Sequence, residues 1–115
     1  WDMAPDKLPT LRTTSSGVDS LCSALDIDHC FDGWHGAVVL QDSEMTVRLR
    51  SSLDHLVVFT NGERDFVAIE PVSHVNNAVN MAGADTEHMQ RLGVRILQPG
   101  QSQSATMRIE TGPAT

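Results

Sequence analysis

The sequence is poor in lysine, cysteine and aromatic residues, and these shortages exclude several classes of protein. Eight lysine and arginine residues, of which Lys7 is the only lysine, stand against 15 acidic residues, for a formal net charge of -7. A surface of this sign repels phosphate backbones, so nucleic acid and anionic membranes are excluded as leading partners. No apolar run approaches the roughly 20 residues that a transmembrane helix needs.

Two cysteines, Cys22 and Cys30, are too few for a disulfide scaffold and lack the C-x2-C spacing of zinc sites. The two cysteines could form a disulfide with each other, or both could be free thiols, and the sequence leaves both alternatives. Adding His29 and His35 gives a set that matches no standard metal template. The acidic residues within 25–34 do not follow the spacing of a calcium-binding loop. We therefore expect no metal site.

Period-two alternation is the dominant pattern, and it predicts half-buried antiparallel strands. The predicted strands are 36–40, 45–50, 56–60, 66–69, 91–96 and 104–110. Turn residues at Asn61-Gly62 and Pro99-Gly100 predict two hairpins, one joining 56–60 to 66–69 and the other joining 91–96 to 104–110.

The remaining segments, 12–34 and 73–87, are predicted to be loops at one rim of the sheets, with a helical turn at 85–90. Several short strands without a long helix predict an all-β fold. We expect residues 1–115 to form one antiparallel β-sandwich domain or part of one.

Glu70 is the first candidate for chemistry, because it ends an apolar strand and directly precedes Pro71. Proline holds the preceding residue in an extended conformation, which gives the carboxylate a fixed direction. Alternation places Glu70 on the face of Phe66 and Ala68, so we expect a partly desolvated carboxylate suited to general-base catalysis. A glutamate that only solvates the strand end is the alternative.

Segment 25–34 is the second candidate, since it gathers acids, a histidine, a thiol and two aromatic rings. An aspartate such as Asp28 near an indole such as Trp34 can hold a sugar through hydroxyl hydrogen bonds and ring contacts. The alternative, in which Trp34 is buried in the core, has equal weight. Ser73 and His74 are adjacent without a hydrolase motif, so we expect His74 to be a loop hydrogen-bonding residue.

Five segments, taken in order, resemble the C-terminal part of the aldose 1-epimerase (galactose mutarotase) family. They are Asp28-His29-Cys30-Phe31 with Gly33-Trp34, Leu56-Val57-Val58-Phe59-Thr60, Ile69-Glu70-Pro71-Val72-Ser73-His74, Asn77-Ala78-Val79-Asn80 and Leu97-Gln98-Pro99-Gly100. The similarity runs from about Leu8 to Thr111. It implies a galactose mutarotase-like supersandwich, of which this chain, which begins with Trp1, is the C-terminal portion.

The resemblance also implies a cofactor-free activity on a small-molecule sugar in the cytoplasm. Glu70 falls on the family's base and Asp28 on its ligand for a sugar hydroxyl, while Trp34 and Phe59 are candidates for lining the pocket. The family's acid histidine, a second histidine and an arginine lie in the N-terminal half, and no histidine of this sequence falls on those positions. We therefore expect the chain to need the missing N-terminal half or a partner chain.

Two alternatives remain open beside the mutarotase interpretation. A hexose-phosphate epimerase of the same superfamily would need clustered arginines, and here only Arg48 and Arg50 are close in sequence, on the polar face of one strand. A non-catalytic carbohydrate-binding β-sandwich module would keep the sugar pocket without the acid-base pair.

Overall fold

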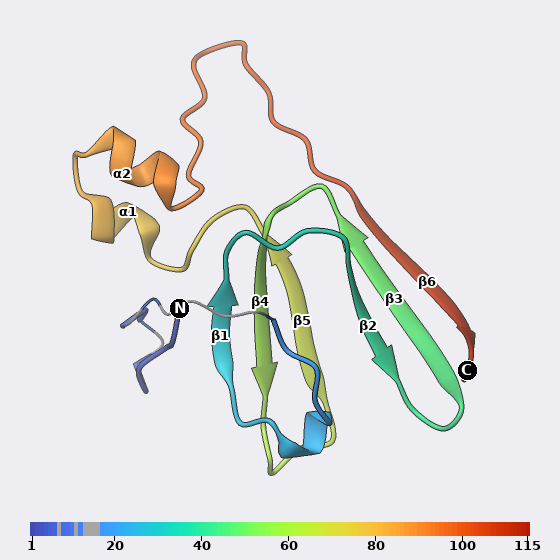
Figure 1. Cartoon of the computed structure of the whole chain (residues 1–115). Helices are drawn as coiled ribbons and strands as arrows, with labels where there is room; N and C mark the ends of the chain where they lie inside the picture. Colours follow the sequence, from blue (N-terminus) through green and yellow to red (C-terminus); the bar gives the residue numbers. More distant parts are fainter. Residues whose placement is uncertain (7, 11, 13–16) are drawn as a thin grey trace.

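A computed structural model describes residues 1–6, 8–10, 12 and 17–115. It contains short strands, two short α-helices and a 3-10 turn (Figure 1). Along the chain these are η1 (Cys22–Ala24), β1 (Asp28–Phe31), β2 (Ala37–Gln41), β3 (Met45–Ser51), β4 (His55–Thr60), β5 (Val67–Val72), α1 (Ala78–Ala82), α2 (Thr86–Arg91) and β6 (Met107–Pro113). None of the helices in the described part of the chain has the length and apolar character that a bilayer span requires.

The strands form two antiparallel sheets of three strands each, with the orders β1-β4-β5 and β2-β3-β6. The chain leaves the first sheet after β1, returns to it at β4, and reaches β6 through a long segment that follows the helices. Figure 1 shows α1 and α2 beside one end of the first sheet and β6 at the outer edge of the second. The prediction of an all-β fold is confirmed.

The hairpins β2-β3 and β4-β5 confirm four of the predicted strands, with small shifts at their ends. The strand predicted at 66–69 continues through Pro71 to Val72, which a proline allows at a sheet edge. The predicted loops were wrong in two places. Segment 12–34 contains β1, and segment 73–87 contains α1.

The strand predicted at 91–96 is wrong, because α2 and its C-terminal turn use this part of the chain. Asp85 begins the helix: its carboxylate accepts a hydrogen bond of 2.9 Å from the backbone N–H of His88, which lowers the pKa of Asp85. The helix ends in a Schellman motif, in which Gly93 N–H donates to Gln90 O and Val94 N–H donates to Met89 O.

Gly93 has a φ of 91°, as the left-handed residue of such a motif requires. Residues 91–93 are therefore committed to the helix end and cannot form a ladder with 104–110. The predicted second hairpin is wrong for this reason. Its second strand, β6, pairs instead with β3, from Ser51 opposite Met107 to Met45 opposite Pro113.

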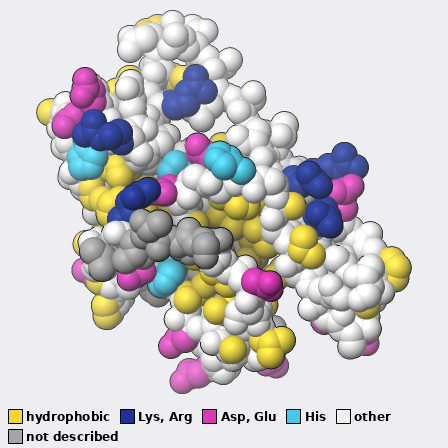
Figure 2. All heavy atoms as spheres, in the orientation of Figure 1, with side chains coloured by type: hydrophobic (Ala, Val, Ile, Leu, Met, Phe, Trp, Pro, Cys, Tyr) yellow, Lys and Arg dark blue, Asp and Glu magenta, His cyan; other side chains and the backbone are white. Residues whose placement is uncertain are grey.

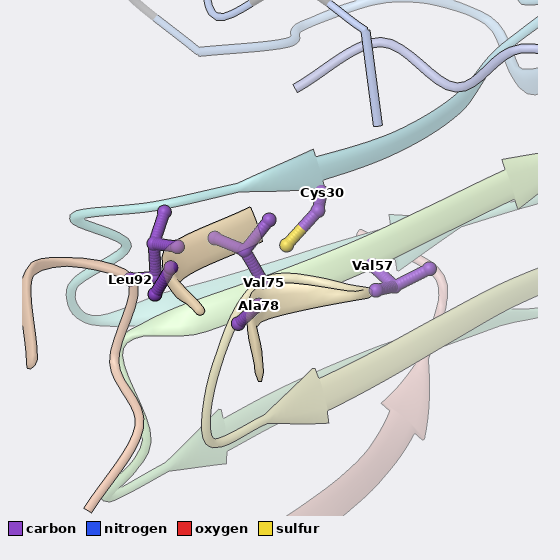
Figure 3. Close-up of a cluster of buried hydrophobic side chains, with 6 residues drawn as sticks. Cys30, Val57, Val75, Ala78 and Leu92 are labelled. Atoms are coloured by element: carbon purple, nitrogen blue, oxygen red, sulfur yellow. The ribbon is translucent and has the colours of Figure 1, made fainter. Parts of the chain in front are cut away.

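The core lies between the first sheet and the two helices (Figure 3). Its fully or nearly buried members are Cys30, Val57, Val75, Ala78, Ala82 and Leu92. The N–H of Val75 donates to the carbonyl of Leu92 over 2.9 Å, which ties the entrance of α1 to the exit of α2. Both Cys22 and Cys30 are free thiols, so the disulfide alternative is not realised.

Gly93 also lies where there is no room for a side chain. Adding a single methyl group there is therefore predicted to lower the stability of the fold strongly. A Cβ there would lie 2.5 Å from the Ser73 carbonyl oxygen and 2.7 Å from the His55 ring. We expect Gly93→Ala to lower the free energy of unfolding by about 2 kcal/mol or more, because the clash adds to the cost of a left-handed alanine.

Gly62→Ala is the matched control, since a Cβ at Gly62 meets nothing within 4 Å. Urea denaturation followed by circular dichroism measures both variants. Equal stabilities for the two variants would show that the Gly93 contact does not constrain the fold.

Candidate functional site

Three candidate residues, Asp28, Phe59 and Glu70, lie on the same face of the first sheet. Asp28 of β1 pairs with Phe59 of β4, which in turn pairs with Ala68 of β5. Residues directly opposite in antiparallel strands point to the same face, so Asp28, Phe59 and Ala68 form one row across the sheet. Glu70 is two residues further along β5 than Ala68, and it therefore shares that face. Register alone brings together residues that are far apart in the sequence.

Two strand spacings and a two-residue step separate Asp28 from Glu70. With strands about 4.8 Å apart and about 3.4 Å per residue, the two Cα atoms lie roughly 12 Å apart. The side chains of Phe59 and Ala68 lie between them on the shared face. We call the surface formed by Asp28, Phe59, Ala68 and Glu70 the carboxylate face.

Glu70 ends the next row, in which Cys30 and Val57 are buried beneath the helices. Its own side chain is exposed, so the predicted partial desolvation is not found in this structure. The helices α1 and α2 cover the β1 and β4 members of the row and leave the β5 member open. The Glu70 carboxylate is accordingly accessible to a ligand that approaches the carboxylate face.

Phe66 lies beside Phe59, in keeping with the shared face that alternation predicts for Phe66, Ala68 and Glu70. The two ring centroids are 6.1 Å apart at an interplanar angle of 40°. Phe59 is half-buried, and 47% of Phe66 is exposed. A pair of apolar rings beside a carboxylate provides both kinds of contact that a sugar uses, ring packing against C–H groups and hydrogen bonds to hydroxyls.

Trp34 lies at the other end of the sheet. It follows the last residue of β1 in the connection to β2, and its backbone N–H donates to Asp54 O over 2.8 Å, just before β4 begins. Asp28 pairs near the opposite end of β4, at Phe59. Asp54 and Phe59 are five residue steps apart, or about 17 Å in an extended strand. The half-buried Trp34 thus does not join the carboxylate face.

The structure places one histidine, His55, on the face that carries Glu70. His55 pairs with Val72, and so it is a diagonal neighbour of Glu70 across β4 and β5. Only 5% of His55 is exposed; its Nδ1 lies 2.8 Å from Asp54 Oδ1, and its buried Nε2 has no hydrogen-bond partner. Gly93 closes over the ring. His55 is therefore sealed from a ligand on the carboxylate face.

The remaining histidines lie elsewhere. His29 pairs with Val58, which puts it on the opposite face of the sheet, with its Nε2 3.3 Å from Asp2 Oδ1. Three others lie outside the strands of this sheet: His35 in the connection to β2, His74 after β5 and His88 on α2. Among the residues that the structure describes, no three histidine, cysteine or acidic side chains are placed to hold a metal ion.

Two open hollows flank this sheet, and neither is lined by Asp28 or Glu70. The larger, of about 640 Å³, is lined by Leu53, Pro71, Val72, Ser73, His74, Asn76, Gln103, Ser104 and Ala105. In its wall the Ser73 hydroxyl lies 2.7 Å from His74 Nδ1, a contact that makes His74 a hydrogen-bonding loop residue as predicted. The smaller hollow, of about 350 Å³, lies at the β4-β5 turn and includes Phe66.

Comparisons of the chain with models of known protein families, with curated proteins and with solved structures found no match.

The buried thiol next to the carboxylate face generates a prediction about reactivity. Cys30 is fully buried, and this burial raises the pKa of its thiol, whereas Cys22 is exposed. Since the thiolate is the reactive form, we expect one thiol per chain to react rapidly with Ellman's reagent in the native state. Denaturation in guanidinium should expose the second.

Cys22→Ser is the informative variant, because it leaves only the buried thiol. It should show no fast-reacting thiol until the protein is unfolded. Rapid reaction of native Cys22→Ser would mean that the helices do not seal the row that ends at Glu70.

Proposed function

We propose that this chain is an aldose 1-epimerase-like protein that binds a hexose on the carboxylate face. The observation that supports the proposal is the shared face itself: Asp28 and Glu70, assigned to sugar binding and to proton removal from the sequence resemblance, flank Phe59 on one sheet. The proposed architecture is the C-terminal part of a mutarotase-like β-sandwich. In this proposal each of the two three-stranded sheets is part of one sheet of the sandwich.

In the proposed reaction Glu70 removes the proton from the anomeric hydroxyl while an acid protonates the ring oxygen. The C1–O5 bond breaks and the open-chain aldehyde forms, so that rotation about C1–C2 allows closure on either face. Asp28 accepts a hydrogen bond from a hydroxyl at the far side of the ring and fixes its position over Phe59. No redox change and no cofactor are involved.

The acid is the missing part of this scheme. His55 shares the face but is sealed beneath Gly93, and the other histidines lie elsewhere. We propose that an N-terminal half or a partner chain supplies the acid. Without it the chain loses the general-acid contribution, about a hundredfold or more in rate.

The same observation favours a second candidate, a carbohydrate-binding module that holds the sugar without turning it over. This module would use Asp28 and the rings of Phe59 and Phe66, and it would not depend on Glu70. The hexose-phosphate alternative draws less support, because Arg48 and Arg50 belong to the second sheet whereas Glu70 belongs to the first.

Glu70→Gln distinguishes the two candidates. Polarimetry of freshly dissolved α-D-glucose and α-D-galactose measures the rate, and binding is measured separately by calorimetry. We expect the chain to accelerate mutarotation weakly and Glu70→Gln to return it to the buffer rate, because the amide cannot take the proton. Glu63→Gln, at an exposed glutamate in the β4-β5 turn, is the matched control and should behave as the parent chain.

Asp28→Asn should weaken sugar binding by about tenfold under either candidate, since a charged acceptor is lost. Sugar binding without any acceleration, unchanged in Glu70→Gln, would replace the mutarotase proposal with the binding module. Absence of sugar binding would remove both.

A further inference from the structure

The outer strand of the second sheet is an open edge. β6 pairs with β3 on one side only, and all seven of its residues are exposed. The edges of the first sheet are blunted: the Trp1-Asp2 backbone pairs along β1 at Cys30 and His29, and β5 carries Pro71. No described segment covers β6 in this way, and its only proline, Pro113, is its last residue.

Hydrogen bonds at both ends of the β3-β6 ladder show which backbone groups of β6 face outward. Ser52 N–H donates to Thr106 O over 3.1 Å, and Ala114 N–H donates to Glu44 O over 3.2 Å. In an antiparallel pair, hydrogen-bonded positions alternate with non-hydrogen-bonded ones. Even-numbered residues of β6 therefore bond toward β3, and the N–H and C=O groups of Met107, Ile109 and Thr111 point to the open edge.

The side chains of β6 select one way of pairing this edge with itself. Two copies related by a twofold axis pair antiparallel, and the residue on the axis defines the register. If Arg108 lies on the axis, the Arg108 side chains of the two copies face each other. If Glu110 lies on the axis, the two Glu110 side chains do so. Met107 or Thr111 on the axis leaves these charges without an opposite partner. Ile109 on the axis sets Arg108 opposite Glu110 of the second copy, twice.

The Ile109 register also satisfies the backbone. Ile109 exchanges both hydrogen bonds with Ile109 of the second copy, and Met107 does so with Thr111 of the second copy, so the outward groups identified above are all paired. The four charges form a square in which every neighbour has the opposite sign. Arg108 and Glu110 already contact each other within one chain at 2.8 Å, so the square extends an existing pair.

We propose that two copies of this chain associate through β6 in the Ile109 register and form one continuous six-stranded sheet. Within one chain Arg108 lies directly opposite Arg50 of β3, which is an unfavourable pair of like charges. The proposed dimer compensates this pair on the charged side of the sheet. A second carboxylate beside Arg108 offsets that repulsion. Figure 2 shows basic and acidic side chains gathered over the second sheet.

The exposed area is consistent with an interface of ordinary size. The chain exposes 8148 Å², about 2,000 Å² more than expected for a compact monomer of 12.5 kDa. Stable interfaces bury about 1,200–2,000 Å² in total, or about 600–1,000 Å² on each partner, which is less than this excess per chain. Met107 and Ile109, which are 59% and 55% exposed, lie on the uncharged side of the sheet and contribute apolar area there.

Charge reversal tests the register, and the full 115-residue chain is used throughout. Sedimentation equilibrium should give the parent chain twice the monomer mass. Arg108→Glu and Glu110→Arg each set like charges opposite one another, and each should raise the dimer dissociation constant by about tenfold or more. An equal mixture of the two variants restores opposite charges at both positions and should form a heterodimer with the affinity of the parent.

Glu63→Arg changes the charge as Glu110→Arg does, but at the β4-β5 turn, and should remain dimeric. Circular dichroism verifies folding of each variant. Arg108→Glu replaces the like charge opposite Arg50 by an opposite one and is the variant of choice if Glu110→Arg does not fold. A monomeric parent chain, a charge-reversed variant that dimerises as the parent does, or a mixture no tighter than its components would overturn the proposal. The test does not depend on sugar binding.

Discussion

The close approach of Gly93 to the Ser73 carbonyl and the His55 ring is the constraint on which the rest of the fold depends. It lets the chain turn sharply after α2, so that Leu92 returns to Val75 and closes the helical cover over the first sheet. That cover buries Cys30 and Val57 and stops short of Glu70. The same contact that forms the core therefore also defines which residues of the carboxylate face stay open.

The two sheets differ in what they leave uncovered. The first has helices over part of one face and a paired or proline-bearing edge, and what remains open is a small surface with carboxylates and phenylalanine rings. Within the described part of the chain no helix packs on the second, and its edge strand is exposed along its whole length. Ligand binding is accordingly proposed on the first sheet and association on the second, so each can be tested without the other.

The strands β2 to β5 could be predicted because alternation and the Asn61-Gly62 turn agree there. The strand at 91–96 could not, because Asp85 and Gly93 begin and end a helix there, and these two signals outweigh the alternation. α1 was missed since its buried residues, Ala78 and Ala82, are small and one helical turn apart. Asp28, Phe59 and Glu70 could be named from the sequence, but their shared face depends on strand register.

The most direct test of the carboxylate face is an NMR titration of the ¹⁵N-labelled chain with D-galactose and D-glucose. We expect saturable amide shifts concentrated at Asp28, Phe59 and Glu70, with little change around Ser73 and His74. Shifts centred on the Ser73–His74 hollow, or no saturable shifts at all, would contradict this expectation.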